Sequence, residues 1–386
     1  MEPLSGIRVV EIAGLSTAYG MRMLAGLGAE VIKVEPPTGD QLRTFPPLAD
    51  GVDAPENGLW FAHFATGKKS VVIDTTTAVG REQLQALVAS ADVVAEDLGE
   101  AGLADVGLDD AALRAEHPGL TWASVTPFGR TGPKKDWKGS NLVAWAACGV
   151  LYTVGFPERA PVLPGGVVQV ACHITSLHAS IGVQLALRAQ RLGGPGQLVD
   201  VSMQDCCVAV APETGPPLFL DDTVHRPRSG NRRPIVRPFG IYPCADGYIS
   251  FLALLPAHWT AMAQWIHEAT GNETVIEEVF NEISVRSDTM DLIDGWTEEL
   301  SATMTKRELF LEGQRRGIPT TPVNTIADLV ADEHLNGVDF WEDVDHPALG
   351  TVQATGAPMR ANPWHWLSGR APLLGEHTDE VLGALS

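Results

Sequence analysis

The sequence predicts an α/β protein of two domains, on the grounds of its length and of an early alternation of strand and helix patterns. The chain has 386 residues, of which 45% are hydrophobic and 19% charged. This length exceeds what a single hydrophobic core usually organises, so we expect two domains. Strand-like and helix-like runs follow one another from the first residues, at the spacing of βαβ units of about 30 residues.

The first part of the chain predicts a doubly wound parallel sheet. Gly6–Ile12 is typical of a strand, Ala18–Leu27 of a helix and Ala29–Val34 of a second strand. Parallel neighbours of this kind need a helical crossover between them, which this order supplies. The alternation continues, in chain order, through Lys69–Asp74, Glu82–Ser90, Asp92–Glu96 and Leu120–Thr126. We therefore expect a Rossmann-like domain.

The pattern changes near Leu142. Leu142–Tyr152 and Ile174–Gln190 predict buried helices, and Leu198–Met203 predicts another strand. The proline-rich segment His225–Pro238 contains five arginines, and it is interpreted either as a solvated connector or as an anion-facing hinge. Ile241–Ala253 then predicts a hairpin that turns at Asp246-Gly247, and helical patterns follow. We expect a smaller α+β domain at 223–329.

Charge and cysteine usage exclude several functions. With 27 Lys and Arg against 48 Asp and Glu, the formal net charge is −21, which disfavours binding to nucleic acid or to an anionic membrane surface. No run approaches the roughly 20 apolar residues of a spanning helix, and the N-terminus lacks a basic signal region. The five cysteines lack zinc-site spacing, and the eleven histidines form no ligand pair. We expect a cytoplasmic protein with reduced thiols and no metal site.

Common nucleotide-binding and hydrolase motifs are absent from the sequence. The first βα turn, Gly14–Gly20, does not contain GxGxxG, so the nicotinamide and flavin fingerprint is missing where it belongs. The chain also contains neither GxxxxGK[ST] nor GxSxG. These absences argue against a P-loop enzyme and against an α/β-hydrolase.

Six segments in a fixed order carry a resemblance to a known family. They are PLSGIRVVEIAG, LGAEVIKVEPPTGDQLR, GKKSVVID, PFGRTGPKKDWKG, IGVQLALRAQRLGGPGQLVDVSM and YPCADGYI. In this order they resemble the family III coenzyme A transferases, which include formyl-CoA and carnitine CoA-transferases and the α-methylacyl-CoA racemases. The resemblance implies a large Rossmann-like domain built from both chain ends, here 1–222 and 330–386, with the smaller domain between. It also implies an interlocked dimer that takes CoA and acyl-CoA as substrates and holds no permanent cofactor.

The resemblance places the family's catalytic aspartate at a cysteine. In the transferases that aspartate attacks the acyl-CoA thioester, and alignment on Ile181-Gly182 puts Cys172 at its position. Cys172 is thus the candidate nucleophile, with a buried structural thiol as the alternative. His173 is a second candidate; His178 lies five residues, or about 140°, further round a helix, so both cannot face one substrate. The racemase acid–base pair is absent, because its Gly-His-Asp segment corresponds to Gly139-Ser140-Asn141.

The resemblance also implies residues that contact CoA. Lys68 and Lys138 correspond to lysines that contact CoA in the family, and a mobile ammonium suits phosphate. Asp105 stands where the family usually has an arginine, and its carboxylate would repel a phosphate.

Three functions remain open at this point. The first is a CoA-transferase acting on carboxylic acids, either a homodimer or one subunit of a heteromer with a paralogue. Val168–Ser180 resembles the aspartate-lacking subunit of two-subunit transferases such as the succinyl-CoA:benzylsuccinate type. The second is a catalytically silent subunit or scaffold for an aspartate-containing paralogue. The third is a divergent acyl-CoA lyase or hydrolase.

Overall fold

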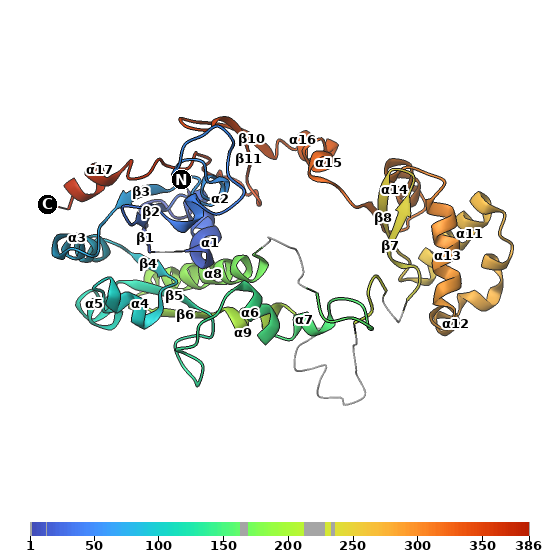
Figure 1. Cartoon of the computed structure of the whole chain (residues 1–386), viewed down its shortest axis with the longest axis horizontal. Helices are drawn as coiled ribbons and strands as arrows, with labels where there is room; N and C mark the ends of the chain where they lie inside the picture. The colour runs from blue at the N-terminus through green and yellow to red at the C-terminus, as the bar shows by residue number, and fades with distance from the viewer. Residues whose placement is uncertain (1, 13, 163–168, 212–227, 233–235, 386) are drawn as a thin grey trace. The chain divides into compact units, whose positions relative to one another are not determined.

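A computed structural model of the chain describes residues 2–12, 14–162, 169–211, 228–232 and 236–385 (Figure 1). The chain forms two compact units. The larger comprises Met1–Tyr152, Leu163–His225 and Gly337–Ser386, and the smaller comprises Thr153–Val162 and Arg226–Asn336. Compared with the expected boundaries, the smaller unit also includes 153–162 and extends to Asn336.

The larger unit contains most of the regular structure. Its strands are β1 (Arg8–Ile12), β2 (Glu30–Glu35), β3 (Lys69–Val72), β4 (Val93–Glu96), β5 (Thr121–Thr126), β6 (Leu198–Ser202), β10 (Trp341–His346) and β11 (Gly350–Thr355). Its helices are α1 (Leu15–Gly26), α2 (Leu59–Phe64), α3 (Ala78–Ala89), α4 (Gly99–Asp105), α5 (Asp110–Glu116), α6 (Asn141–Ala147), α7 (Val150–Thr153), α8 (Val170–Arg191), α9 (Met203–Val210) and α17 (Thr378–Gly383).

The smaller unit is α+β, as the sequence predicts. Its strands are β7 (Phe239–Cys244), β8 (Gly247–Leu252) and β9 (Thr320–Pro322), and its helices are α11 (Pro256–Thr270), α12 (Ile283–Asp288), α13 (Met290–Ser301), α14 (Lys306–Arg315), α15 (Ile326–Val330) and α16 (Glu333–Gly337). The predicted hairpin is β7–β8, in which Cys244 pairs with Gly247 across the turn. Three tryptophans of its core, Trp259, Trp265 and Trp296, pack around Phe251 and Phe280.

The larger unit is built on a six-stranded sheet in the order β3-β2-β1-β4-β5-β6. All of its neighbouring strands run parallel. The order reverses between β1 and β4, which is the switch point of a doubly wound fold. The predicted Rossmann-like sheet is therefore confirmed, with all six strands at the expected segments.

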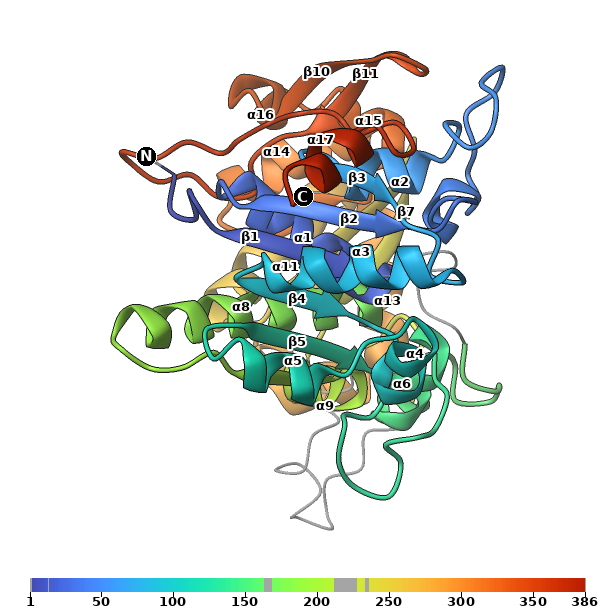
Figure 2. The same ribbon diagram turned by 90° about the vertical axis from the view of Figure 1, so that its left-hand side faces the viewer.

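Helices cover both faces of this sheet (Figure 2). Helices α3, α4, α5 and α17 lie on one face, and α1 and α8 on the other. Alternate residues of one strand face opposite sides, so Val10 of β1 packs in the core under α3 while Val9 packs under α1 and α8. Both faces are buried, which explains why the strands have apolar residues on both sides of the sheet.

Helices α1 and α8 cross closely at a glycine. A Cβ atom at Gly20 would lie 2.0 Å from the carbonyl oxygen of Ser176, and the Gly20 N–H donates to the Ser176 hydroxyl at 2.6 Å. Contrary to the expectation from the sequence, helix α8 is long and apolar enough to cross a membrane by length and composition, and half of its most apolar window is buried in the chain. Its packing on α1, β5 and β6 makes it a core helix of this unit.

Two sequence expectations need adjustment. The single helix predicted at Leu142–Tyr152 is two helices, α6 and α7, because Gly149 between them adopts a left-handed φ of +86°. The proposed hinge at His225–Pro238 lies partly outside the described residues. Within the described part, Arg232 pairs with Asp291 at 2.6 Å and with Asp294 at 3.1 Å, so this arginine already has acidic partners.

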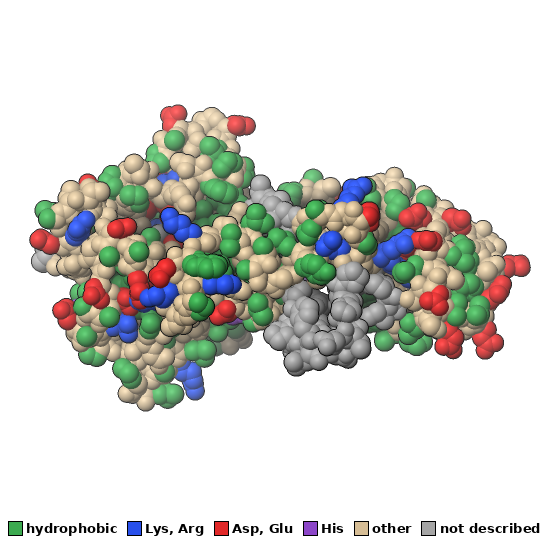
Figure 3. Space-filling model, turned by 60° about the horizontal axis from the view of Figure 1, so that its bottom comes forward, with side chains coloured by type: hydrophobic (Ala, Val, Ile, Leu, Met, Phe, Trp, Pro, Cys, Tyr) green, Lys and Arg blue, Asp and Glu red, His purple; other side chains and the backbone are tan. Residues whose placement is uncertain are grey.

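The acidic balance of the sequence is visible on the surface. Red carboxylates gather at the end of the smaller unit that carries α11 to α13 (Figure 3). The exposed acidic residues of this stretch are Glu268, Glu273, Glu277, Glu278, Glu282, Asp288, Asp291, Glu298 and Glu299. A surface of this charge repels polyanions, in line with the exclusion of nucleic acid.

Candidate functional site

A cavity lies at the carboxyl edge of the parallel sheet, beside the switch point. Its volume is about 290 Å³, and it is lined by the ends of β1 and β2 and by residues of the loops that follow them and β4, including Ile12, Gly14, Glu35, Asp40 and Leu98. Ligands of open α/β sheets bind outside the carboxyl ends of the strands at this point. This edge is therefore the first candidate for a substrate site.

Asp97 connects the ends of β1 and β4 at this edge. Its carboxylate accepts hydrogen bonds from the backbone N–H groups of Gly14 and Ser16, at 3.1 and 3.2 Å, and so caps the start of α1. Burial raises the pKa of Asp97 to about 7, although the charge of Lys33 and the Ser16 N–H oppose the rise. A carboxyl group with this pKa exchanges its proton near neutral pH.

A buried ionic cluster lies beside Asp97 and contains Lys68. The Lys68 ammonium is 2.6 Å from Glu11 and also donates to the Ala18 carbonyl at 2.9 Å. Lys33 is 2.8 Å from Asp40. The Lys68 side chain is 2% exposed, so in this structure it neutralises Glu11 rather than facing solvent. Burial lowers the pKa of Lys68, and Glu11 opposes that effect.

Lys138, the second predicted CoA contact, lies on an exposed loop before α6. The same loop places Lys134 above the rings of Phe128 and Trp137, at 5.4 and 5.6 Å. Asp105 is the last residue of α4, and its side chain is exposed to solvent. The structure thus separates the two predicted lysines, because one is buried in the ionic cluster and the other is on the surface.

Cys172 is the third residue of α8 and is buried, with 5% of its surface exposed. Asn141 fixes the start of this helix, because its side-chain oxygen accepts from the Ala171 N–H at 2.8 Å. Burial raises the pKa of the Cys172 thiol to about 11. The charge of Asp97 adds to this rise, whereas a hydrogen bond with Ser16 opposes it. The thiol is therefore protonated at neutral pH, and a protonated thiol is a poor nucleophile.

His173 faces a different environment from Cys172, because consecutive helical residues point about 100° apart. Its ring lies 5.1 Å from that of Phe64 and 6.0 Å from that of Tyr19. Burial lowers the pKa of His173, and its Nδ1 is buried with no hydrogen-bond partner in the part of the chain that the structure describes. His178 is turned away and bonds the Ile174 carbonyl at 2.9 Å. Cys172 and His173 therefore do not converge on one reacting atom.

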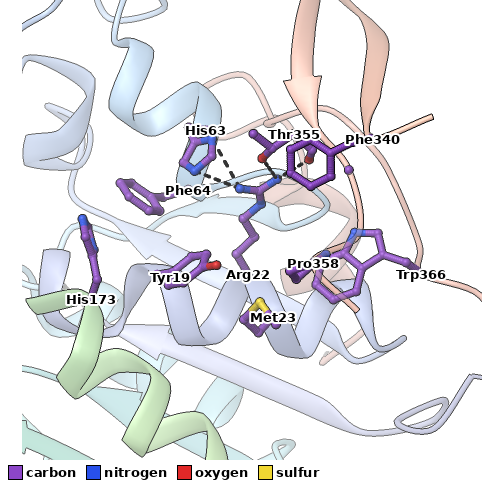
Figure 4. Close-up of a pocket in the computed structure, with 11 residues that line it drawn as sticks. Tyr19, Arg22, Met23, His63, Phe64, His173, Phe340, Thr355, Pro358 and Trp366 are labelled. Carbon is purple, nitrogen blue, oxygen red and sulfur yellow. Dashed lines mark hydrogen bonds between the residues drawn. The ribbon is translucent and has the colours of Figure 1, made fainter. Parts of the chain in front are cut away.

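His173 lines a second cavity of about 290 Å³ (Figure 4). Helix α1 supplies Tyr19, Arg22 and Met23, helix α2 supplies His63 and Phe64, and the C-terminal part of the chain supplies the opposite wall. The remaining lining residues are Phe340, Thr355, Gly356, Pro358 and Trp366.

Arg22 is the charged group of this second cavity. Its guanidinium donates to the carbonyl oxygen of Thr355 at 2.9 Å and to the Thr355 hydroxyl at 3.1 Å, and it lies 2.9 Å from Nε2 of His63. Burial and the charge of Arg22 lower the pKa of His63 to about 4, so this ring is neutral at pH 7. Arg22 was not predicted from the sequence, although it is the only charged residue of the helix LSTAYGMRMLAG and could have been noticed for that reason.

The similarity to known proteins spans the chain. The family described as CoA-transferase family III matches residues 4–378. The succinyl-CoA:(R)-benzylsuccinate CoA-transferase subunit BbsE of Thauera aromatica is 31% identical over 99% of this chain and 94% of its own. The succinyl-CoA–L-malate CoA-transferase alpha subunit of Chloroflexus aurantiacus is 30% identical over 99% of this chain and 89% of its own.

A solved structure agrees in fold with the whole chain. It is a CAIB/BAIF family protein from Brucella suis, with a TM-score of 0.89 and 30% identity, and the match covers 100% of both chains. The six-stranded parallel sheet and the small antiparallel sheets therefore belong to a fold already seen in that structure.

Proposed function

Because the chain belongs to CoA-transferase family III, we propose that it is a subunit of an enzyme that moves CoA between succinyl-CoA and another carboxylic acid. The observation that carries the proposal is the end-to-end similarity to proteins named as subunits of succinyl-CoA-dependent transferases. The cavity at the carboxyl edge of the sheet supports it, because a nucleotide-bearing substrate binds at this place in doubly wound folds. CoA is then a substrate, and no permanent cofactor is part of the proposal.

The environment of Cys172 supports a subunit that relies on a partner. In the usual cycle a carboxylate attacks the thioester carbonyl, a mixed anhydride forms and CoA leaves as a thiolate. A thiol with a pKa of about 11 does not perform this attack at neutral pH. A thioester at Cys172 would also release CoA without the anhydride that recaptures it. We therefore propose that the nucleophile comes from an aspartate-containing paralogue in an interlocked heteromer.

A catalytically silent subunit is the second candidate. The buried position of Cys172 among the apolar residues of α6, α8 and α9 favours it, since a small side chain there fills the core. A cytoplasmic location is part of both proposals, because the five cysteines are free thiols and thiols persist in a reducing compartment.

The test compares the chain alone with the chain co-expressed with an aspartate-containing paralogue. Each sample receives succinyl-CoA and a panel of dicarboxylic acids, and product acyl-CoA is measured by mass spectrometry. We expect transfer only in the co-expressed sample, with hydroxylamine-sensitive enzyme–CoA thioester on the paralogue. Exchange by the chain alone, with a thioester on one of its own acidic residues, would contradict the subunit proposal.

Two variants assign the role of position 172. Cys172→Ser should leave the activity of the heteromer within a few-fold of the parent, and Cys206→Ser, at another buried cysteine of the larger unit, is the matched control. Loss of activity in the first variant alone would make Cys172 a catalytic group. Free CoA released from succinyl-CoA without an acceptor, followed with a thiol reagent, would favour the hydrolase alternative.

A further inference from the structure

Arg22 is buried, yet it has no acidic partner. The residue is 5% exposed, and among the residues that the structure describes it forms no ion pair. Its hydrogen-bond acceptors are Thr355 and the neutral ring of His63. Glu342 acts on Arg22 only from beyond ion-pair distance. The positive charge of the guanidinium is therefore not neutralised by a contact within this region.

Other buried cations of the same unit provide the comparison. Lys33 lies 2.8 Å from Asp40, Arg43 lies 2.7 Å from Glu35, and Lys68 lies 2.6 Å from Glu11. A buried charge costs several kcal/mol of solvation unless an opposite charge and hydrogen bonds compensate it. Lys33, Arg43 and Lys68 each have a carboxylate as counter-charge, whereas Arg22 has none among the described residues.

Unused hydrogen-bonding groups lie at the same cavity. Nε of Arg22 and Nδ1 of His173 are both buried, and neither has a hydrogen-bond partner among the described residues. A guanidinium has five N–H donors in a planar fork that matches a carboxylate. The cavity therefore presents a cation with spare donors, which is the complement of a carboxylate oxygen.

The other walls of the cavity are apolar. Tyr19, Phe64, Phe340, Pro358 and Trp366 surround the space beside the guanidinium (Figure 4). Its volume of about 290 Å³ is close to the lower end of the range for small-molecule sites, roughly 300–1,000 Å³. The space suits a small organic acid whose body is apolar, and it is too small for a whole CoA molecule.

We propose that this cavity binds the carboxylate of a small organic acid, with Arg22 as the anion-binding residue and the aromatic walls holding an apolar or aryl body. The acid lies beside the start of α8, next to the position that the family uses for chemistry. Its identification as the acid substrate of CoA exchange rests on the proposed function, whereas the binding of the carboxylate does not.

The test is isothermal titration of the full-length chain, without CoA, with 3-phenylpropionate and with 3-phenylpropionamide. The two probes share a shape and differ in charge. A hydrogen bond to a charged group contributes about 1.5–3 kcal/mol, so we expect the acid to bind at least tenfold more tightly than the amide. Succinate, which lacks the apolar body, should bind more weakly than 3-phenylpropionate.

Variants at Arg22 then locate the site. Arg22→Gln should weaken binding of the acid by about tenfold or more and leave binding of the amide within twofold, whereas Arg22→Lys should retain part of the preference. Arg307→Gln, at an exposed arginine of the smaller unit, is the matched control and should bind as the parent does. If Arg22→Gln does not fold, the acid–amide pair on the parent and the Arg22→Lys variant decide the question.

Two results would overturn the proposal. One is equal binding, or no binding at millimolar concentration, of the acid and the amide by the parent chain. The other is unchanged acid binding by folded Arg22→Gln, which would leave Arg22 as a structural tie between α1, α2 and β11. Acid binding that depends on Arg22 in a protein that binds no CoA would instead sustain this site and sink the proposed function.

Discussion

Two buried groups of charged residues adjoin helix α1, and they differ in how their cations are satisfied. In the ionic cluster at the sheet edge, defined by Glu11, Lys33, Asp40 and Lys68, each ammonium has a carboxylate within 3 Å. Arg22 lies one turn after Ala18, whose carbonyl accepts from Lys68, and its acceptors among the described residues are all neutral. Both regions are buried, so burial does not distinguish them.

This contrast separates buried charges that stabilise the fold from a buried charge that can still bind a ligand. A paired buried charge has already recovered part of its solvation cost inside the protein, and removal of its partner leaves an uncompensated ion. An unpaired buried charge has not, so an external anion can still stabilise it. We therefore expect the ionic cluster to govern stability and Arg22 to govern binding.

The largest effect should follow Glu11→Gln. This change removes the carboxylate of Lys68 while its shape is kept, so the Lys68 ammonium stays buried without a counter-charge. We expect a loss of about 3–5 kcal/mol in the free energy of unfolding, measured by urea denaturation.

The matched control for Glu11 is Glu30→Gln. Glu30 pairs with Arg8 and Lys69, but its side chain is 33% exposed. Exposed pairs contribute about 0–1 kcal/mol, so the control should lose no more than that. Equal losses for the two variants would mean that pairing in the ionic cluster does not set the stability.

The sequence predicted the sheet of this protein well and its charged sites poorly. Strands such as Val93–Glu96 can be recognised in the sequence, because a strand buried on both faces is mostly apolar, here in three of its four residues. The ionic cluster could not be foreseen, since the Lys68–Glu11 contact joins residues 57 positions apart through the order of strands in the sheet. Lys68 was therefore predicted only as a contact to CoA, and its buried pairing with Glu11 became visible in the structure.

The sequence also could not predict where the side chains of the candidate site point. The family resemblance identified Cys172, and His173 was a candidate as its neighbour, but the direction of each side chain depends on how α8 packs on its neighbours. Cys172 turns into an apolar cluster and His173 into the aromatic cavity. Arg22 lies in a helix that reads as core, and only the fold shows that no carboxylate meets it.

The second largest effect on stability should come from Asp97, a buried carboxyl group that accepts hydrogen bonds from backbone N–H groups and forms no ion pair among the described residues. Its folded pKa of about 7 lies above the unfolded value of about 3.9, so between these values the native state holds a proton that the unfolded state has lost. Because the native state binds this proton more tightly, protonation of Asp97 stabilises the fold fully below pH 4. This stabilisation falls as the pH rises from 4 to 7 and is lost above pH 7.

We test this with Asp97→Asn, which does not titrate. Relative to this variant, the wild type should lose roughly 2.5 kcal/mol of stability between pH 5 and pH 8, at up to about 1.4 kcal/mol per pH unit. Asp50→Asn, at an exposed position, should show no such difference. A pH-independent gap between wild type and Asp97→Asn would show that the carboxyl is ionised throughout this range.

A smaller effect is expected for Arg22→Met. The change removes hydrogen bonds to Thr355, but it also removes a buried charge that has no ion pair. We expect the free energy of unfolding to change by about 1 kcal/mol, whereas Arg43→Met, which strands the buried carboxylate of Glu35, should lose about 3–5 kcal/mol. Similar losses in the two variants would remove the distinction between paired and unpaired cations.

The smallest effect, here on the affinity for CoA, should come from Lys138, whose side chain is exposed to solvent. Its side chain lies on an exposed loop, so a contact with a CoA phosphate would be worth less than about 1 kcal/mol, or two- to fivefold in affinity. Salt screens such a contact, because the Debye length falls from about 30 Å at 0.01 M to about 8 Å at 0.15 M. Titration calorimetry with CoA should therefore show a lower affinity for Lys138→Ala than for the parent at low salt, and this difference should shrink at high salt.

Asp105→Arg, which reverses a charge on α4, should instead raise the affinity for CoA, with the same salt dependence. If Lys138→Ala binds CoA as tightly as the parent at low salt, the loop does not contact the phosphates, and the contrast between buried and exposed cations has no part in CoA binding.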